Sequence, residues 1–151
     1  MTARLEIRDF VHGARPVYDA LIAISKSATE AGLEESLLEI VKTRASQINA
    51  CAYCVQFHVN AARKHGVEQA KLDQLAAWHE SPLFSSRERA ALAWTDTLTL
   101  LGPESAEDEI YEAMRAEFDD VQWPALTTAI GLINLWNRLG VAMRYTPPPA
   151  A

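Results

Sequence analysis

Residues 35–66 read ESLLEIVKTRASQINACAYCVQFHVNAARKHG, a stretch that indicates the fold class and contains both cysteines. In its first half, apolar residues recur at the spacing of one helix face: Leu37, Val41, Ala45 and Ile48. A break near Asn49 separates this helix from a second one, expected from about Ala52 to His65 and ended by Gly66. The stretch therefore predicts two consecutive helices joined by a short corner.

The same helical period continues along the rest of the chain. Further helices are expected over about residues 16–32, 68–78, 85–101 and 105–118, followed by a long last helix that Asp120 and Pro124 begin. Ser85 with Glu88 forms a capping box, and Ser105 is the expected cap of its helix. Two expected core stripes complete the pattern: Val17, Leu21, Ile24, Ala28 and Ala90, Trp94, Leu98, Leu101. With no hairpin signal, the sequence predicts an all-α bundle of about six to seven helices.

The last helix is unusually apolar. It carries hydrophobic side chains on more than one face, so it must be buried centrally or against another subunit. Asn134, Asn137 and Arg138 interrupt it, which argues against a membrane span and predicts a hydrogen-bond network instead. We expect the protein to self-associate through apolar helix faces.

The length, composition and net charge of the chain indicate its domain organisation and argue against some classes of partner. The chain has 151 residues, of which 49% are apolar, and a net charge of −6. We expect a single helical domain over residues 1–146 and a proline-rich tail over 147–151. The negative charge argues against nucleic acid and anionic membranes as partners. The first ten residues resemble no signal peptide, so a cytoplasmic location is expected.

The chain has two cysteines, Cys51 and Cys54. A bridge between them would close almost no loop and would stabilise folding little, so redox or metal chemistry is the better interpretation. On a helix, positions i and i+3 lie roughly 5–6 Å apart, and His58 is i+4 from Cys54. A helix N-terminus can lower a thiol pKa from about 8.5 to between about 3.5 and 7.5, and an imidazole exchanges protons near neutral pH. The spacing thus predicts a reactive dithiol.

Two questions stay open at the level of the residues. The helix dipole favours Cys51 as the more acidic thiol, whereas adjacency to His58 favours Cys54. The same three side chains could hold zinc with His65 or Glu39 as a fourth ligand, although one helix rarely encloses such a site. The cysteines could also be two small buried hydrophobic residues, and Glu39, considered by itself, a solvated charge.

Glu39 stands twelve residues before Cys51, and the cysteines and His58 form a Cys-x-x-Cys-x-x-x-His pattern. In an all-helical chain this pattern resembles the alkyl hydroperoxidase D-like proteins of the carboxymuconolactone decarboxylase superfamily. The resemblance is carried by residues 37–100 and extends over most of the chain. The decarboxylase branch of that superfamily lacks the paired cysteines, so their presence here argues against lactone decarboxylation.

The resemblance implies a peroxidase that needs no cofactor or metal. Cys54 would reduce a hydroperoxide, Cys51 would resolve the product to a disulfide, and Glu39 with His58 would relay protons. A dithiol reductant would reopen the bridge, and the expected assembly is a trimer or hexamer. Some members carry a histidine between the cysteines, where this chain has Tyr53. A protein thiol–disulfide oxidoreductase and a redox-sensing or zinc-binding module remain alternatives.

Overall fold

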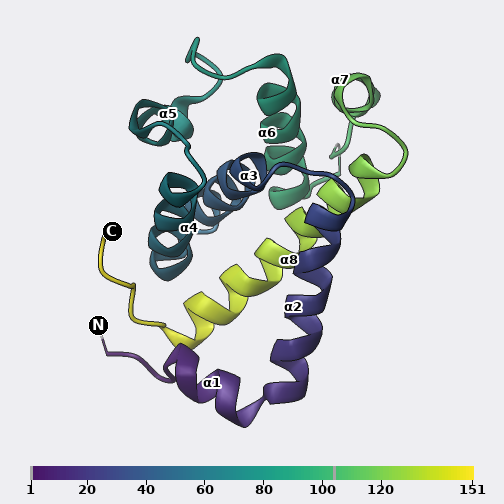
Figure 1. The fold of residues 1–151 in the computed structure, drawn as a ribbon. Helices are drawn as coiled ribbons and strands as arrows, with labels where there is room; N and C mark the ends of the chain where they lie inside the picture. The colour runs from purple at the N-terminus through teal and green to yellow at the C-terminus, as the bar shows by residue number, and fades with distance from the viewer. Residues whose placement is uncertain (1, 104) are drawn as a thin grey trace.

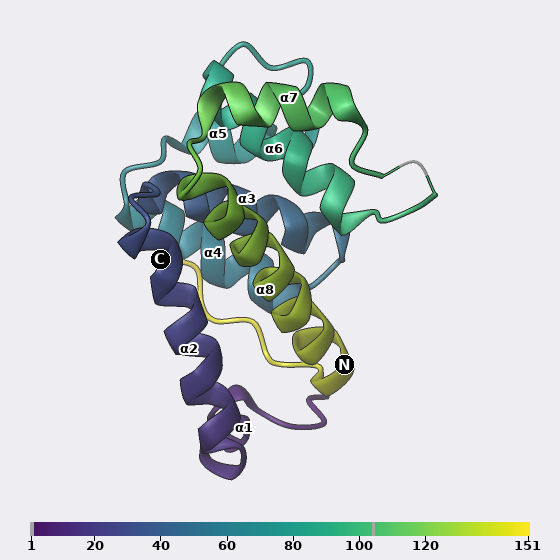
Figure 2. The same ribbon diagram turned by 90° about the vertical axis from the view of Figure 1, so that its right-hand side faces the viewer.

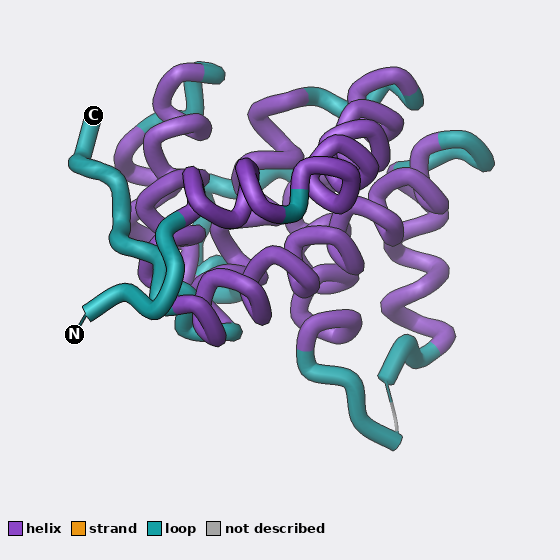
Figure 3. The backbone as a smooth tube through the Cα atoms, turned by 90° about the horizontal axis from the view of Figure 1, so that it is seen from below, coloured by secondary structure: helices purple, strands orange, loops and turns teal. Residues whose placement is uncertain are grey.

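A computed structural model describes residues 2–103 and 105–151, and its regular elements over these ranges are all helical (Figure 3). They are α1 Ile7–Gly13, α2 Arg15–Glu30, α3 Glu35–Ile48, α4 Ala52–Lys64, α5 Gln69–Gln74, a 3-10 helix η1 Leu75–Ala77, α6 Ser86–Thr99, α7 Asp108–Glu117 and α8 Gln122–Met143. The all-α prediction is confirmed.

The predicted number of helices was too low, because the described residues contain eight α-helices. The additional one is α1, which precedes α2 with only Ala14 between them. It has seven residues and buries only Phe10, so its sequence carries too short a pattern to reveal a periodic face.

Two predicted helix ends follow the glycines that mark them. Gly32 and Gly66 have φ values of 83° and 82°, a left-handed conformation that glycine adopts without steric cost. After Gly66, the Val67 amide donates to the Ala62 carbonyl at 2.9 Å, which closes α4 with a Schellman motif. The capping box of Ser85 and Glu88 is also present at the start of α6.

Several predicted core positions are exposed. Val17 and Ile24 lie outside the core because α2 packs through a narrow face that buries Leu21 and Ala28. Leu101 is 72% exposed because α6 ends at Thr99, before that residue. Ser105 does not cap α7. Its hydroxyl accepts a hydrogen bond from the Gly102 amide instead.

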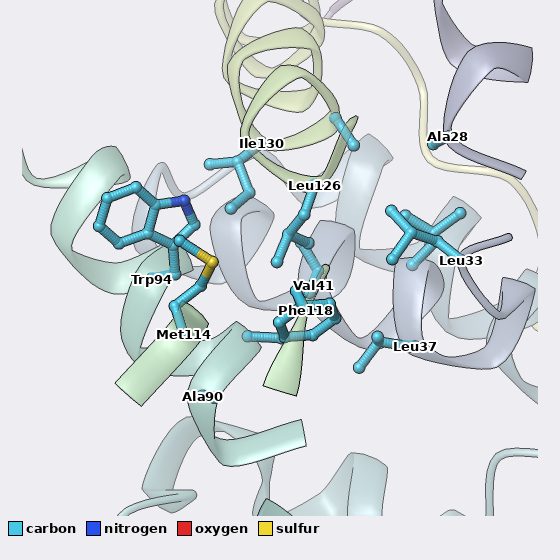
Figure 4. Packing of buried hydrophobic residues seen from close by; sticks show 13 residues of the cluster. Ala28, Leu33, Leu37, Val41, Ala90, Trp94, Met114, Phe118, Leu126 and Ile130 are labelled. Carbon is cyan, nitrogen blue, oxygen red and sulfur yellow. The ribbon is translucent and has the colours of Figure 1, made fainter. Parts of the chain in front are cut away.

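The core is divided into two clusters by α3. One side of α3 contributes Leu37 and Val41, which meet Trp94, Phe118 and Ile130 from the segments around α6, α7 and α8 (Figure 4). The opposite side contributes Ile40, which packs with a second cluster made by α4, α5, η1 and α6. The helix that carries Glu39 is therefore held on two sides.

The long helix α8 runs diagonally through the molecule beside α2 (Figure 1), and it also packs against α3 and α4. α7 lies across α6 at the end of the molecule opposite α1 (Figure 2). No helix within residues 2–103 and 105–151 is both long enough and apolar enough to cross a membrane.

The predicted polar network of α8 lies within the chain. The side-chain amide of Asn49, at the end of α3, donates to the side-chain oxygens of both Asn134 and Asn137, at 2.9 Å each. Asn137 in turn donates to the Ser46 hydroxyl, and Arg138 donates to the Asn134 carbonyl. The network fixes the corner between α3 and α4 against α8. Self-association remains a prediction.

Candidate functional site

The cysteines occupy the corner that follows α3. Ala50 adopts a left-handed conformation with φ 53°, and the Cys51 amide donates to the Ser46 carbonyl at 3.0 Å. This is the same Schellman arrangement that ends α2 and α4, but with alanine in the strained position, where a β-carbon costs roughly 1–2 kcal/mol. The corner places Cys51 at the N-cap of α4 and Cys54 in its first turn.

The two cysteines form a disulfide, with α-carbons 5.3 Å apart. Both are buried, Cys51 at 2% exposure and Cys54 at 4%. The backbone N–H of Cys54 points to the Cys51 sulfur at 3.3 Å. An N–H donor and the helix N-terminus both stabilise negative charge on this sulfur, so Cys51 is suited to be a leaving thiolate.

Glu39 and His58 form a buried pair between α3 and α4. The His58 Nδ1 atom lies 2.7 Å from Glu39 Oε2, and the other carboxylate oxygen accepts from the Lys42 ammonium at 2.7 Å. Glu39 is 7% exposed, so it is not the solvated charge that its position alone suggested. Lys42 was not among the predicted site residues, although its i+3 spacing from Glu39 is visible in the sequence.

Glu39 is held as a carboxylate. Burial by itself would raise its pKa, but the hydrogen bond and charge of His58, together with Lys42, outweigh burial and lower the pKa from 4.5 to about 2. A carboxylate at Nδ1 favours the tautomer that is protonated on that nitrogen, which leaves Nε2 free as the base. The arrangement can therefore take a proton and stabilise the imidazolium that results.

A cavity of about 330 Å³ adjoins these groups, and its wall is mostly apolar and aromatic. Five helices, α1, α2, α3, α4 and α8, and the segment after α8 supply its lining. Its lining comprises Ile7, Val11, Tyr18, Ile22, Ser25, Glu39, Lys42, Tyr53, Cys54, Phe57, His58, Ala129, Leu132, Ile133, Trp136 and Tyr145. Cys54 and the Glu39–His58 pair thus face one space, and Cys51 is not part of the lining.

Aromatic side chains cluster beside Cys54. Tyr53, which stands between the cysteines, stacks on Phe57 with ring centroids 6.0 Å apart and meets Tyr145 edge-on at 5.4 Å. Burial raises the pKa of Tyr53 and of Tyr145, so both phenols are protonated at neutral pH. The buried Tyr145 hydroxyl finds no hydrogen-bond partner among the described residues.

The remaining histidines lie elsewhere. His65 pairs with Glu35 at 2.7 Å on the surface, a partner that its spacing did not suggest, and His79 stacks on Trp78. Across residues 2–103 and 105–151, no three or more His, Cys, Asp or Glu side chains are grouped so that they could hold a metal ion.

Residues 15–97 match the sequence profile of the carboxymuconolactone decarboxylase family. The uncharacterized protein YdfG of Bacillus subtilis (strain 168) is 33% identical over 123 residues, which cover 82% of this chain and 84% of YdfG. The uncharacterized protein YnjA of Escherichia coli (strain K12) is 32% identical over 111 residues, which are 74% of this chain but only 60% of YnjA.

Solved structures extend the likeness to the whole fold. A protein of unknown function from Agrobacterium tumefaciens, a candidate antioxidant defence protein AhpD, superposes with a TM-score of 0.89 at 34% identity, over 98% of this chain and 99% of that one. The debrominase Bmp8 superposes with a TM-score of 0.78, over 90% of this chain and 74% of its own. Its identity is 19%, so this second likeness concerns the fold alone.

Proposed function

This chain belongs to the carboxymuconolactone decarboxylase family, as an AhpD-like protein with a Cys-x-x-Cys pair, and we propose that it is a thiol-dependent reductase of organic hydroperoxides. The observation that carries the proposal is the shared cavity. Cys54 of the pair, a carboxylate-held imidazole and an apolar wall line the same cavity.

The first step is attack by Cys54. In the reduced protein, His58 Nε2 takes the Cys54 proton, and the thiolate attacks the terminal oxygen of the hydroperoxide ROOH. The O–O bond breaks, the sulfur gains the OH group as a sulfenic acid, and the departing RO⁻ takes the proton from His58 to leave as ROH. Glu39 stays ionised and stabilises the imidazolium between these two transfers.

The second step uses Cys51. Cys51 is the N-cap residue of α4, where the backbone N–H of Cys54 stabilises its thiolate. It attacks the sulfenic sulfur, hydroxide leaves and is protonated to water, and the Cys51–Cys54 disulfide of the structure forms. A dithiol reductant then returns two electrons and two protons by exchange. Attack on Cys54 expels Cys51, the better leaving group.

The cavity favours an organic substrate over hydrogen peroxide. Its wall offers hydrocarbon and aromatic contact to an R group, and burying apolar surface contributes roughly 25 cal/mol per Å². Hydrogen peroxide has no such group. Access to the buried cysteines by a bulky protein disulfide is also restricted, since neither sulfur belongs to a surface residue.

We therefore expect the reduced protein to be oxidised at least about tenfold faster by cumene hydroperoxide than by hydrogen peroxide, which corresponds to roughly 1.4 kcal/mol of apolar contact. The measurement is the stopped-flow rate of thiol loss with each oxidant and with insulin disulfide at equal concentration. Oxidation by insulin alone would replace this proposal with a protein thiol–disulfide oxidoreductase.

A further inference from the structure

Gly140 lies directly beneath the cysteine pair. It is a buried residue of α8, and its missing side chain is what lets that helix approach the sulfurs. A β-carbon at this position would lie 2.7 Å from the Cys51 sulfur and 3.2 Å from the Cys54 sulfur. Non-bonded atoms pack at about 3.5–4.0 Å, so both sulfurs occupy space that any other residue type would fill.

The close approach is fixed by contacts on either side of Gly140. Within the two turns before Gly140, the side chains of Asn137 and Asn134 accept from Asn49, which sets the position of α8 along the α3–α4 corner. The Trp136 carbonyl lies 3.9 Å from the Cys54 sulfur. After the helix, the Tyr145 amide donates to the Gly140 carbonyl at 3.1 Å. The helix is therefore not free to retreat from an added methyl group.

We propose that Gly140 is a positioning residue that sets the balance between the dithiol and the disulfide of Cys51 and Cys54. The inference rests on the redox cycle of the proposed function, but not on a peroxide as the oxidant. The relevant reaction is disulfide plus two glutathione thiols giving dithiol plus glutathione disulfide, a transfer of two electrons and two protons.

The direction of the effect follows from side-chain freedom. In the disulfide, one covalent bond ties both sulfurs into the space above Gly140. In the dithiol, each side chain can turn independently to another staggered rotamer. A methyl group at position 140 therefore penalises the disulfide more than the dithiol, and glycine keeps the oxidised form accessible.

Gly140→Ala is the test, and Gly131→Ala is its matched control. Both glycines lie in α8, so both substitutions gain the same helix propensity, but a β-carbon at Gly131 meets nothing within 4 Å. In glutathione redox buffers we expect Gly140→Ala to shift the equilibrium constant about tenfold toward the dithiol, or about 30 mV, and Gly131→Ala to match the parent. A constant for Gly140→Ala within twofold of the control's, or a shift toward the disulfide, overturns the proposal.

A second comparison separates contact with sulfur from general damage to the fold. In a Cys51→Ala/Cys54→Ala background the sulfurs are gone, so Gly140→Ala should unfold at the same temperature as Gly131→Ala in that background. A thermal penalty that persists there places the clash elsewhere and contradicts the proposal. Because no peroxide is used, a parent protein that fails to reduce hydroperoxides would count against the proposed function alone.

Discussion

Cys54→Ser is expected to lower the rate of organic hydroperoxide reduction by at least about 10³-fold, because a hydroxyl cannot replace the thiolate nucleophile at neutral pH. Cys54 is the sulfur that lines the cavity with Glu39 and His58. The measurement is steady-state hydroperoxide consumption with dithiothreitol as the reductant, at pH 7.

Cys51→Ser is the matched control, since it removes the neighbouring sulfur by the same chemical change. It should lose turnover with dithiols but still react once with hydroperoxide, and leave a sulfenic acid on Cys54 that a dimedone probe traps. The opposite pattern, with the single reaction kept in Cys54→Ser and lost in Cys51→Ser, would assign the attacking role to Cys51.

Glu39→Gln is expected to slow hydroperoxide reduction by about 10²-fold at pH 7. The amide keeps the size of the side chain but carries no charge, so it cannot stabilise the imidazolium that forms when His58 takes the Cys54 proton. Glu35→Gln is the control, because Glu35 also pairs with a histidine at 2.7 Å, but at the surface and outside the cavity. Equal rates for the two variants would remove Glu39 from the proton relay.

The same variant should change the acid stability of the fold. Glu39 has a pKa of about 2 when folded, against an ordinary 4.5, so its carboxylate stabilises the folded state above pH 4.5. That contribution is lost as the pH falls from 4.5 toward 2. Between pH 6 and pH 3 the parent should lose about 2 kcal/mol more unfolding free energy than Glu39→Gln, measured by urea denaturation. Parallel pH curves would show that the buried ion pair is not formed in solution.

The parts of the fold that the sequence predicted are those set by local rules. Gly32 and Gly66 end their helices, and Ser85 with Glu88 begins α6, because each of these signals acts within one turn. The helix α1 is too short to show a periodic face, and the exposure of Val17 depends on which face of α2 packs against α8, which no local pattern encodes.

The same distinction between local rules and tertiary packing applies to the residues of the candidate site. Cys51, Cys54 and His58 share one helix, so their proximity follows from helical spacing. Glu39 was identified only through the family pattern, because its contact with His58 joins two helices. Tyr145 and Gly140 are more than 80 residues from the cysteines in sequence, and only the packing of α8 brings Gly140 to the sulfurs and Tyr145 to the cavity.

The proposed reaction requires that a hydroperoxide oxidise the reduced Cys51–Cys54 pair to one intramolecular bridge. The most direct measurement is titration of the reduced protein's thiols before and after one equivalent of cumene hydroperoxide, followed by mass mapping of the cysteine peptides. We predict that two thiols disappear for each hydroperoxide consumed and that one Cys51–Cys54 bridge accounts for both. Two thiols that persist in the presence of the hydroperoxide, or that are lost without forming this bridge, would show that this reaction does not occur.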